Sequence, residues 1–255
     1  MDLGFKGKTV IITGGTKGIG AGITEVFAEE GANLIIDYRS NRDNSSENFI
    51  AEIVKKYNVE AYGIQADVSI PEDIGRIFDF AEEKFGRIDV LINNAGSGKT
   101  TMIEDISLEE WNDALTNNVT GQFLMCREFA RRLLPQNKKG YIVNLLSKAS
   151  LTTTTKGRAC YVTNKAAEMG LTKQLAVDLG DRGIICNGIM PGSVMNELMK
   201  DYTPEQLEAR AQRSPIKRLG QPYEFGKMVA FLASEQNTLS VGAPVDNTGG
   251  MMLGF

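Results

Sequence analysis

The chain has 255 residues, of which 42% are hydrophobic and 24% are charged, and its formal net charge is -4. This hydrophobic fraction is enough for one large core, and the modest charge gives no electrostatic reason to expect nucleic acid or an anionic membrane as a partner. The chain contains no histidine, which excludes a Ser-His-Asp triad and every histidine-ligated metal site. We therefore expect no metal, and any acid–base chemistry near neutral pH must use another side chain.

Cysteine usage and the N-terminus indicate a cytoplasmic protein. Cys126, Cys160 and Cys186 are widely spaced and odd in number, which matches neither a disulfide framework nor a metal-binding spacing. The first eight residues are mixed in charge, and no apolar run has the length of a signal peptide or a membrane span. We expect reduced cysteines and no membrane partner.

Short β-rich runs alternate with helical periods from one end of the chain to the other. The expected strands are residues 9–13, 33–37, 61–66, 88–92, 141–146, 184–190 and 243–247. The expected helices are residues 19–30, 49–57, 74–85, 107–134, 161–179 and 222–233, and a capping-box spacing (Ser69/Glu72, Ser107/Glu110) precedes the third and fourth of these. This alternation predicts an α/β fold, a doubly wound parallel sheet with helices on both faces.

No linker or internal repeat divides the chain, so we expect a single domain over residues 1–255. The least regular stretch, residues 192–221, is rich in Met, Arg and Pro. An irregular insertion near the carboxyl ends of strands is a candidate substrate lid.

A glycine-rich turn joins the first expected strand to the first helix. The segment reads Thr13-Gly14-Gly15-Thr16-Lys17-Gly18-Ile19-Gly20. Glycines are needed there for a tight turn, for close approach of the backbone to phosphate, and for close helix–strand packing, while the helix N-terminus offers free N–H groups. The context predicts a dinucleotide site.

A tyrosine and a lysine one helical turn apart form the candidate catalytic pair. Tyr161 and Lys165 share one face at the start of a helix, and Ser147 ends the strand before it. A free tyrosine has a pKa of about 10, but a nearby ammonium stabilises its phenolate. The pair can therefore supply acid–base chemistry without histidine.

These motifs together resemble the short-chain dehydrogenases/reductases. In that family's order the chain carries Thr13-Gly14-x-x-x-Gly18-x-Gly20, Asp67-Val68, Asn93-Asn94-Ala95-Gly96, Asn118, Ser147, Tyr161-x-x-x-Lys165 and Pro191-Gly192. The resemblance covers essentially the whole chain. It implies a Rossmann-type sheet of seven parallel strands and a nicotinamide cofactor.

The resemblance also implies a role for each matching residue. Tyr161 would exchange a proton with the substrate oxygen, Ser147 would hydrogen-bond that oxygen, Lys165 would hold the nicotinamide ribose, and Asn118 would position a water that relays protons. The remaining cofactor-binding residues would be Gly14, Thr16, Lys17, Gly18, Ile19, Gly20, Tyr38, Arg39, Asp67, Val68, Asn94, Ala95, Gly96, Pro191, Gly192 and Val194.

The end of the second strand decides between the two nicotinamide cofactors. An acid at the discriminating position would bind the ribose 2′-OH of NAD. Counting from Gly31-Ala32, that position is Tyr38, and Arg39 follows it, so Arg39 and Lys17 predict NADP(H). Asp37 keeps NAD(H) as the alternative, although strand alternation predicts that its side chain points away.

Three functions fit the sequence. The first is transfer of a hydride between NADP(H) and a small secondary alcohol or ketone, such as a sugar, a steroid or another metabolite. The alternative enzyme is a 3-oxoacyl-carrier-protein reductase of fatty-acid synthesis, and the third possibility is a catalytically silent nucleotide-binding sensor. By resemblance we also expect a homotetramer built on the helices 108–134 and 161–179.

The stretch Gly96-Ser97-Gly98-Lys99-Thr100-Thr101 looks like the end of a phosphate-binding P-loop. The full pattern requires glycine five residues before Gly98, and that position is Asn93. We expect a loop beside the active site instead.

Overall fold

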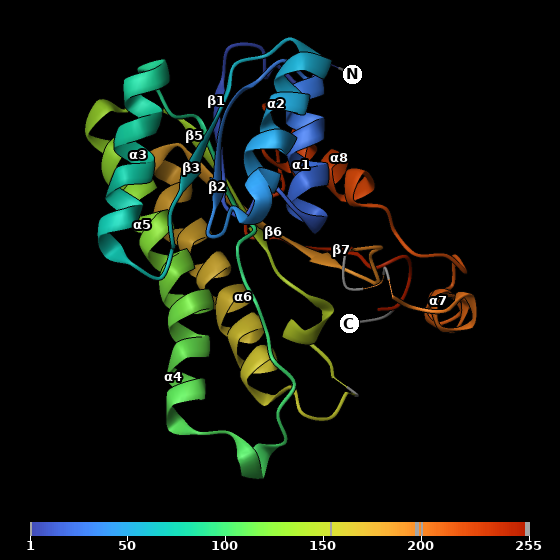
Figure 1. The fold of residues 1–255 in the computed structure, drawn as a ribbon. Helices are drawn as coiled ribbons and strands as arrows, with labels where there is room; N and C mark the ends of the chain where they lie inside the picture. The colour runs from blue at the N-terminus through green and yellow to red at the C-terminus, as the bar shows by residue number, and fades with distance from the viewer. Residues whose placement is uncertain (1, 154, 197–198, 200, 253–255) are drawn as a thin grey trace.

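The computed structural model describes residues 2–153, 155–196, 199 and 201–252. Its seven strands form one sheet, all parallel, in the order β3-β2-β1-β4-β5-β6-β7 (Figure 1). The strands are β1 Thr9–Ile12, β2 Asn33–Tyr38, β3 Ala61–Gln65, β4 Val90–Asn93, β5 Gly140–Leu145, β6 Ile184–Pro191 and β7 Pro244–Asn247. The predicted fold class is confirmed.

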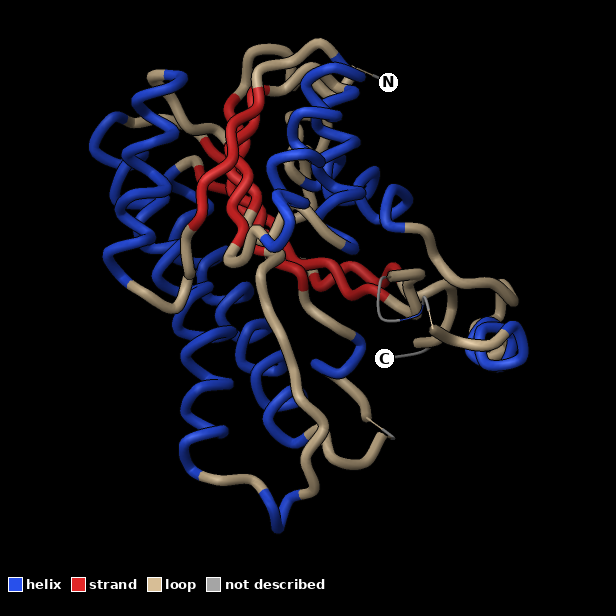
Figure 2. Tube along the Cα trace, viewed as in Figure 1, coloured by secondary structure: helices blue, strands red, loops and turns tan. Residues whose placement is uncertain are grey.

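Helices cover both faces of this sheet (Figure 2). The α-helices are α1 Gly18–Glu29, α2 Ser45–Tyr57, α3 Pro71–Phe85, α4 Leu108–Leu115, α5 Gly121–Leu133, α6 Ala159–Leu179, α7 Pro204–Ala211 and α8 Pro222–Leu232. Short 3₁₀ turns are η1 Arg42–Asn44, η2 Ile103–Asp105, η4 Leu134–Gln136, η5 Lys148–Ser150 and η6 Gly180–Arg182, and η3 Thr116–Thr120 is a π-helical turn.

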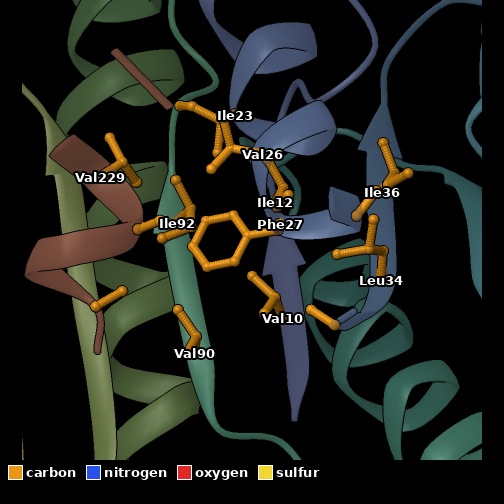
Figure 3. Packing of buried hydrophobic residues seen from close by; sticks show 14 of the residues in the cluster. Val10, Ile12, Ile23, Val26, Phe27, Leu34, Ile36, Val90, Ile92 and Val229 are labelled. Atoms are coloured by element: carbon orange, nitrogen blue, oxygen red, sulfur yellow. The ribbon is translucent and has the colours of Figure 1, made fainter. Parts of the chain in front are cut away.

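The alternation of side chains along each strand divides the interior into two cores. Ile12 of β1 lies in the same core as Phe27 of α1 and Val229 of α8 (Figure 3). The neighbouring Ile11 packs with α3 and α5 on the other face of the sheet. Because both faces are covered, the central strands read as unbroken apolar runs, and β1 is buried at every residue.

One of the two expected helix caps and one long helix differ from the sequence-based expectation. Ser69 does not cap α3, because its N–H and its hydroxyl both donate to Asp67 Oδ1, and the helix begins at Pro71. Ser107 does cap α4, accepting from the Glu110 N–H at 3.0 Å. The predicted continuous helix 107–134 is divided by the π-turn η3 into α4 and α5.

The predicted lid region, 192–221, contains α7 and lies beyond the carboxyl end of β6, with residues 197–198 and 200 outside the described part. Met199, Ala211 and Leu219 form a small separate core there. An isolated parallel bridge between Val194 and Gly220 joins the two ends of this segment. Within the described residues, no helix has the length and apolarity needed to cross a membrane.

Candidate active site

The glycine turn between β1 and α1 has the geometry that a phosphate-binding loop needs. Gly14 (φ 61°) and Gly18 (φ 52°) adopt left-handed backbone that favours glycine. A Cβ added to Gly20 would collide with Gly14 O and with the Asn94 side chain, whereas a Cβ on Gly18 would point into open space. Gly20 is therefore required for packing, and the space beside Gly18 at the N-terminus of α1 leaves room for a pyrophosphate.

Asn94 holds this turn against the end of β4. Its Nδ2 donates to Thr13 O at 3.0 Å and to Gly14 O at 2.9 Å, and its own N–H and that of Ala95 donate to Thr13 Oγ1. The sequence-predicted pair Asn94 and Ala95 is thus part of the turn's framework, beside the point where the strand order reverses between β1 and β4. In α/β sheets such a reversal is the usual ligand-binding position.

At the end of β2, one expectation needs correction. The Asp37 side chain does not point away from the turn: it is buried, and Oδ2 accepts the Gly14 N–H at 3.3 Å. Burial is the main cause that raises the pKa of Asp37 to about 7. The Tyr38 side chain packs in the core beside Gly63. At this position only the main chain of Tyr38 can contact a cofactor.

The two predicted cations lie on the surface beside the turn. Lys17 is exposed and is the N-cap residue of α1, and the exposed Arg39 follows β2 directly. Arg39 Nη1 lies 3.9 Å from Asp67 Oδ2, which brings the ends of β2 and β3 together. Because both side chains are exposed, the Arg39 guanidinium and the Lys17 ammonium can turn towards an anion at this edge of the sheet.

The other predicted residues on the adenosine side serve local structure as well. Thr16 Oγ1 lies 3.2 Å from Ser46 Oγ of α2, and Ile19 packs against the core on that face. Asp67 anchors Ser69, and a Cβ on Gly121 would press on the backbone of Val68.

The candidate catalytic residues gather at the carboxyl end of the sheet, where η5 and α6 pack together. Ser147 is nearly buried, and its Oγ accepts the Ala149 N–H at 3.1 Å. Tyr161 lies in the first turn of α6, with Gly98 against its ring and the Arg158 guanidinium 4.2 Å from the ring centroid. The loop 96–101 therefore does lie beside Tyr161.

Asn118 and Lys165 meet at Gly96. A Cβ on Gly96 would lie 3.0 Å from Asn118 Oδ1 and 3.9 Å from Lys165 Nζ. Asn118 Oδ1 also accepts the Ser97 N–H at 3.0 Å, so the π-turn η3 is tied to the loop after β4. Three segments far apart in sequence thus converge on the ammonium.

The carboxyl end of β6 carries three more of the predicted cofactor-binding residues. Pro191 pairs with Asn247 of β7, and a Cβ on Gly192 would press on the Thr248 backbone. Val194 is buried. These residues close the carboxyl end of the sheet on the side of the predicted lid.

Sequence reasoning overlooked Glu168. This buried carboxylate lies 2.7 Å from Lys165 Nζ, one helical turn further along α6. The signal was present as the i,i+3 spacing of opposite charges, but the charge pattern alone does not show that both groups are buried. No cluster of histidine, cysteine or acidic residues suited to a metal occurs within the described residues.

A parallel sheet with this strand order and a glycine turn at its point of reversal define the Rossmann-type class of dinucleotide-binding folds. Comparison with known proteins narrows that class. A sequence profile of the family described as "Enoyl-(Acyl carrier protein) reductase" matches residues 14–252. Glucose 1-dehydrogenase 2 of Bacillus subtilis is 34% identical over 249 residues, which cover 97% of this chain and 95% of the relative.

Other relatives carry different activities on the same framework. The 3-oxoacyl-acyl-carrier-protein reductase FabG of Staphylococcus epidermidis is 31% identical over 246 residues, covering 96% of this chain and 99% of that protein. The structure of L-sorbose reductase from Gluconobacter frateurii, complexed with NADPH and L-sorbose, superposes with a TM-score of 0.92 at 29% identity over the full length of both chains. This chain belongs to the short-chain dehydrogenases/reductases.

Proposed function

We propose that this protein is an NADP(H)-dependent oxidoreductase that transfers a hydride between nicotinamide and a small secondary alcohol or ketone. The observation that carries the proposal is the convergence of Tyr161, Lys165 and Asn118 at the carboxyl end of the sheet, beside the glycine turn. The similarity to a glucose dehydrogenase and to an L-sorbose reductase favours a sugar or polyol as the substrate.

Tyr161 is the proton donor and acceptor in this proposal. In reduction its hydroxyl gives a proton to the carbonyl oxygen, and in oxidation its phenolate takes the proton back. The Ser147 hydroxyl accepts one hydrogen bond from Ala149, which leaves its hydrogen to donate to the same substrate oxygen. Lys165 stabilises the phenolate and holds the ribose, and Asn118 positions the relay water.

The glycine turn fits a bound dinucleotide, since a Cβ at Gly18 would enter open space at the N-terminus of α1. In this proposal the remaining predicted cofactor-binding residues, from the ends of β2, β3 and β4 to Pro191, Gly192 and Val194, contact the dinucleotide. Lys17 and Arg39 are exposed, and in this proposal they bind the 2′-phosphate. When bound, NADPH supplies the hydride.

NADP(H) is supported by two of the most similar solved structures. One is the NADPH complex of L-sorbose reductase, and the other is a short-chain dehydrogenase of Burkholderia cenocepacia in complex with NADP, with a TM-score of 0.88 at 30% identity over 97% of this chain and 98% of that one. We further propose one domain over residues 1–255, with residues 192–221 as its lid over the substrate.

Substitution of Tyr161 by Phe tests the chemistry. Turnover of NADPH with a panel of sugars and ketones should fall about 10²–10⁴-fold, because the proton donor is lost. NADPH affinity, measured by fluorescence titration, should stay close to that of the wild type. Near-wild-type turnover in this variant contradicts the assignment of Tyr161, and a wild type that binds NADPH without turning over any substrate supports the silent sensor instead.

A second candidate activity is reduction of 3-oxoacyl groups on a carrier protein. The 31% identity to FabG over almost its whole length favours it. Val177 is exposed on α6, however, and it offers no positive charge to an acidic carrier protein. Comparing kcat/KM for a 3-oxoacyl-carrier-protein and for free ketoses separates the two activities.

A further inference from the structure

The ammonium of Lys165 has a buried counter-ion on its own helix. Lys165 Nζ donates to Glu168 Oε2 and to Leu145 O, each at 2.7 Å. The side chains of Lys165 and Glu168 are only 10% and 3% exposed. Water therefore screens this ion pair weakly, so the charge of Glu168 acts strongly on its surroundings.

The hydrogen bonds of Lys165 limit the direction in which its ammonium can act. An ammonium has three N–H donors. Two of them are taken by Glu168 and by the carboxyl end of β5, which leaves one for the side where Gly96 and Asn118 lie. Glu168 therefore fixes the direction in which the last donor of Lys165 can act.

The backbone of Glu168 is linked to the sheet through Thr172. Thr172 Oγ1 donates to Glu168 O at 2.8 Å and accepts from Asn144 Nδ2 at 2.9 Å, which joins α6 to β5. Burial raises the pKa of the Glu168 carboxyl, and the adjacent Lys165 opposes that rise. The Lys165 ammonium at 2.7 Å offsets part of the cost of burying the carboxylate.

The other ionisable groups around Glu168 lie on α6 itself and on the elements packed against it. Burial raises the pKa of the Cys186 thiol on β6 well above its ordinary value, so this group is neutral. Among the charges on described elements packed against α6, Lys165 alone contributes to the pKa of Glu168. The remaining ionisable groups are Cys160, Tyr161, Lys173 and Asp178 on α6 itself, Lys148 in η5, Glu109, Glu110 and Asp113 in α4, Cys126, Arg127, Glu128, Arg131 and Arg132 in α5, and Asp181 and Arg182 in η6.

We propose that Glu168 is a positioning residue that acts through Lys165: its carboxylate keeps the lysine charged, aims the last N–H of the lysine at the cofactor side, and sets the pH range in which Tyr161 exchanges its proton. This inference rests on the proposed function. The Glu168 side chain is only 3% exposed and contacts Lys165, so its effect is electrostatic and transmitted by the ammonium.

The sign of the effect follows from charge alone. A negative charge near an acid makes loss of a proton harder, and removing that charge makes it easier. In the Glu168→Gln variant, formation of the phenolate and loss of the ammonium proton should both occur at lower pH. Both limbs of the pH profile for alcohol oxidation should therefore move in the same direction, by about one pH unit.

The experiment compares wild type with Glu168→Gln, using Asp178→Asn as the matched control on the exposed face of α6. The first measurement is kcat/KM for alcohol oxidation between pH 5 and pH 10. The second uses the protein without cofactor: tyrosinate absorbance is titrated, and the titration of the matching Tyr161→Phe background is subtracted. We expect both profiles to shift down in Glu168→Gln and to stay in place in the control.

Profiles of Glu168→Gln that coincide with wild type, or that move to higher pH, overturn the proposal. If Glu168→Gln does not fold, the pair Glu168→Asp and Glu168→Asn makes the same comparison, and Glu168→Asp should restore the wild-type pH range. A wild type without turnover contradicts the proposed function, whereas the tyrosinate titration tests Glu168 in either case.

Discussion

At the scale of single residues, the chain keeps two buried carboxylates close to its candidate site, and they behave differently. Glu168 has a cation within 2.7 Å, so burial is compensated. Asp37 has only the Gly14 N–H at 3.3 Å, while its Oδ1 is buried without a hydrogen-bond partner among the described residues. Burial, and then the nearby Asp67 and Asp73, raise the pKa of Asp37 to about 7.

The raised pKa makes folding stability depend on pH in a defined direction. A carboxyl whose pKa is 3.8 unfolded and about 7 folded binds more protons in the folded state, so stability is lost as pH rises from about 4 to 7. Asp37→Asn mimics the protonated form and removes this loss. The free energy of unfolding of Asp37→Asn relative to wild type should be up to roughly 4 kcal/mol higher at pH 8 than at pH 4.

Chemical denaturation of wild type and Asp37→Asn at several pH values measures this gain. The exposed Asp43, in η1, provides the control Asp43→Asn, whose effect should stay small throughout. A stability difference between Asp37→Asn and wild type that is the same at pH 4 and pH 8 would contradict the assignment.

Cofactor choice is also decided by single residues. If Lys17 and Arg39 bind the 2′-phosphate, NADPH should be preferred over NADH by about tenfold or more in kcat/KM, since each charge-assisted contact contributes roughly 1.5–3 kcal/mol. Arg39→Ala should reduce that preference by weakening the use of NADPH and should leave the use of NADH almost unchanged.

Steady-state kinetics with both cofactors measure this preference, with Arg42→Ala as a control for loss of an exposed arginine in the neighbouring turn. A wild type that prefers NADH, and loses that preference in Asp37→Asn, would show that Asp37 is the discriminating acid.

At the scale of elements, the close approach of α1 and α8 depends on two glycines. A Cβ on Gly22 would collide with the backbone of Pro222 and Tyr223, and a Cβ on Gly226 would lie 2.6 Å from Gly22 O. Gly75 in α3, by contrast, has nothing within 4 Å of an added Cβ. The two kinds of helical glycine look alike in sequence, but only the first kind is needed for packing.

Gly22→Ala should therefore destabilise the fold by about 1–3 kcal/mol, because the helices must separate. Gly75→Ala should instead stabilise it by about 0.5–1 kcal/mol, because alanine favours the helix at an open site. Thermal unfolding of both variants measures the contrast. Equal effects of the two substitutions would show that helix propensity, not the α1–α8 contact, determines the outcome.

At the scale of the whole molecule, the described surface leaves apolar side chains on the helices expected to form subunit contacts. Leu108, Phe123 and Val177 on α4, α5 and α6 are all exposed. Exposed apolar side chains on helices that flank a sheet can be buried against a symmetry mate. We therefore expect a homotetramer.

Light scattering should give a mass near four times that of the 27.9 kDa chain. Val177→Asp should reduce the mass if α6 is part of the interface, because a charge would then be buried without a partner. A wild type that is monomeric in dilute solution at neutral pH would refute the prediction.

The sequence by itself determined the sheet, its parallel direction and the glycine turn between β1 and α1, because these depend on local periodicity and on glycine spacing. Tertiary structure alone decided the orientation of Asp37, the π-turn that positions Asn118 and the burial of Glu168 beside Lys165. Each of these depends on which groups from distant segments surround a side chain. Strand alternation and helical spacing describe one element at a time, so they cannot show which groups other elements bring against it.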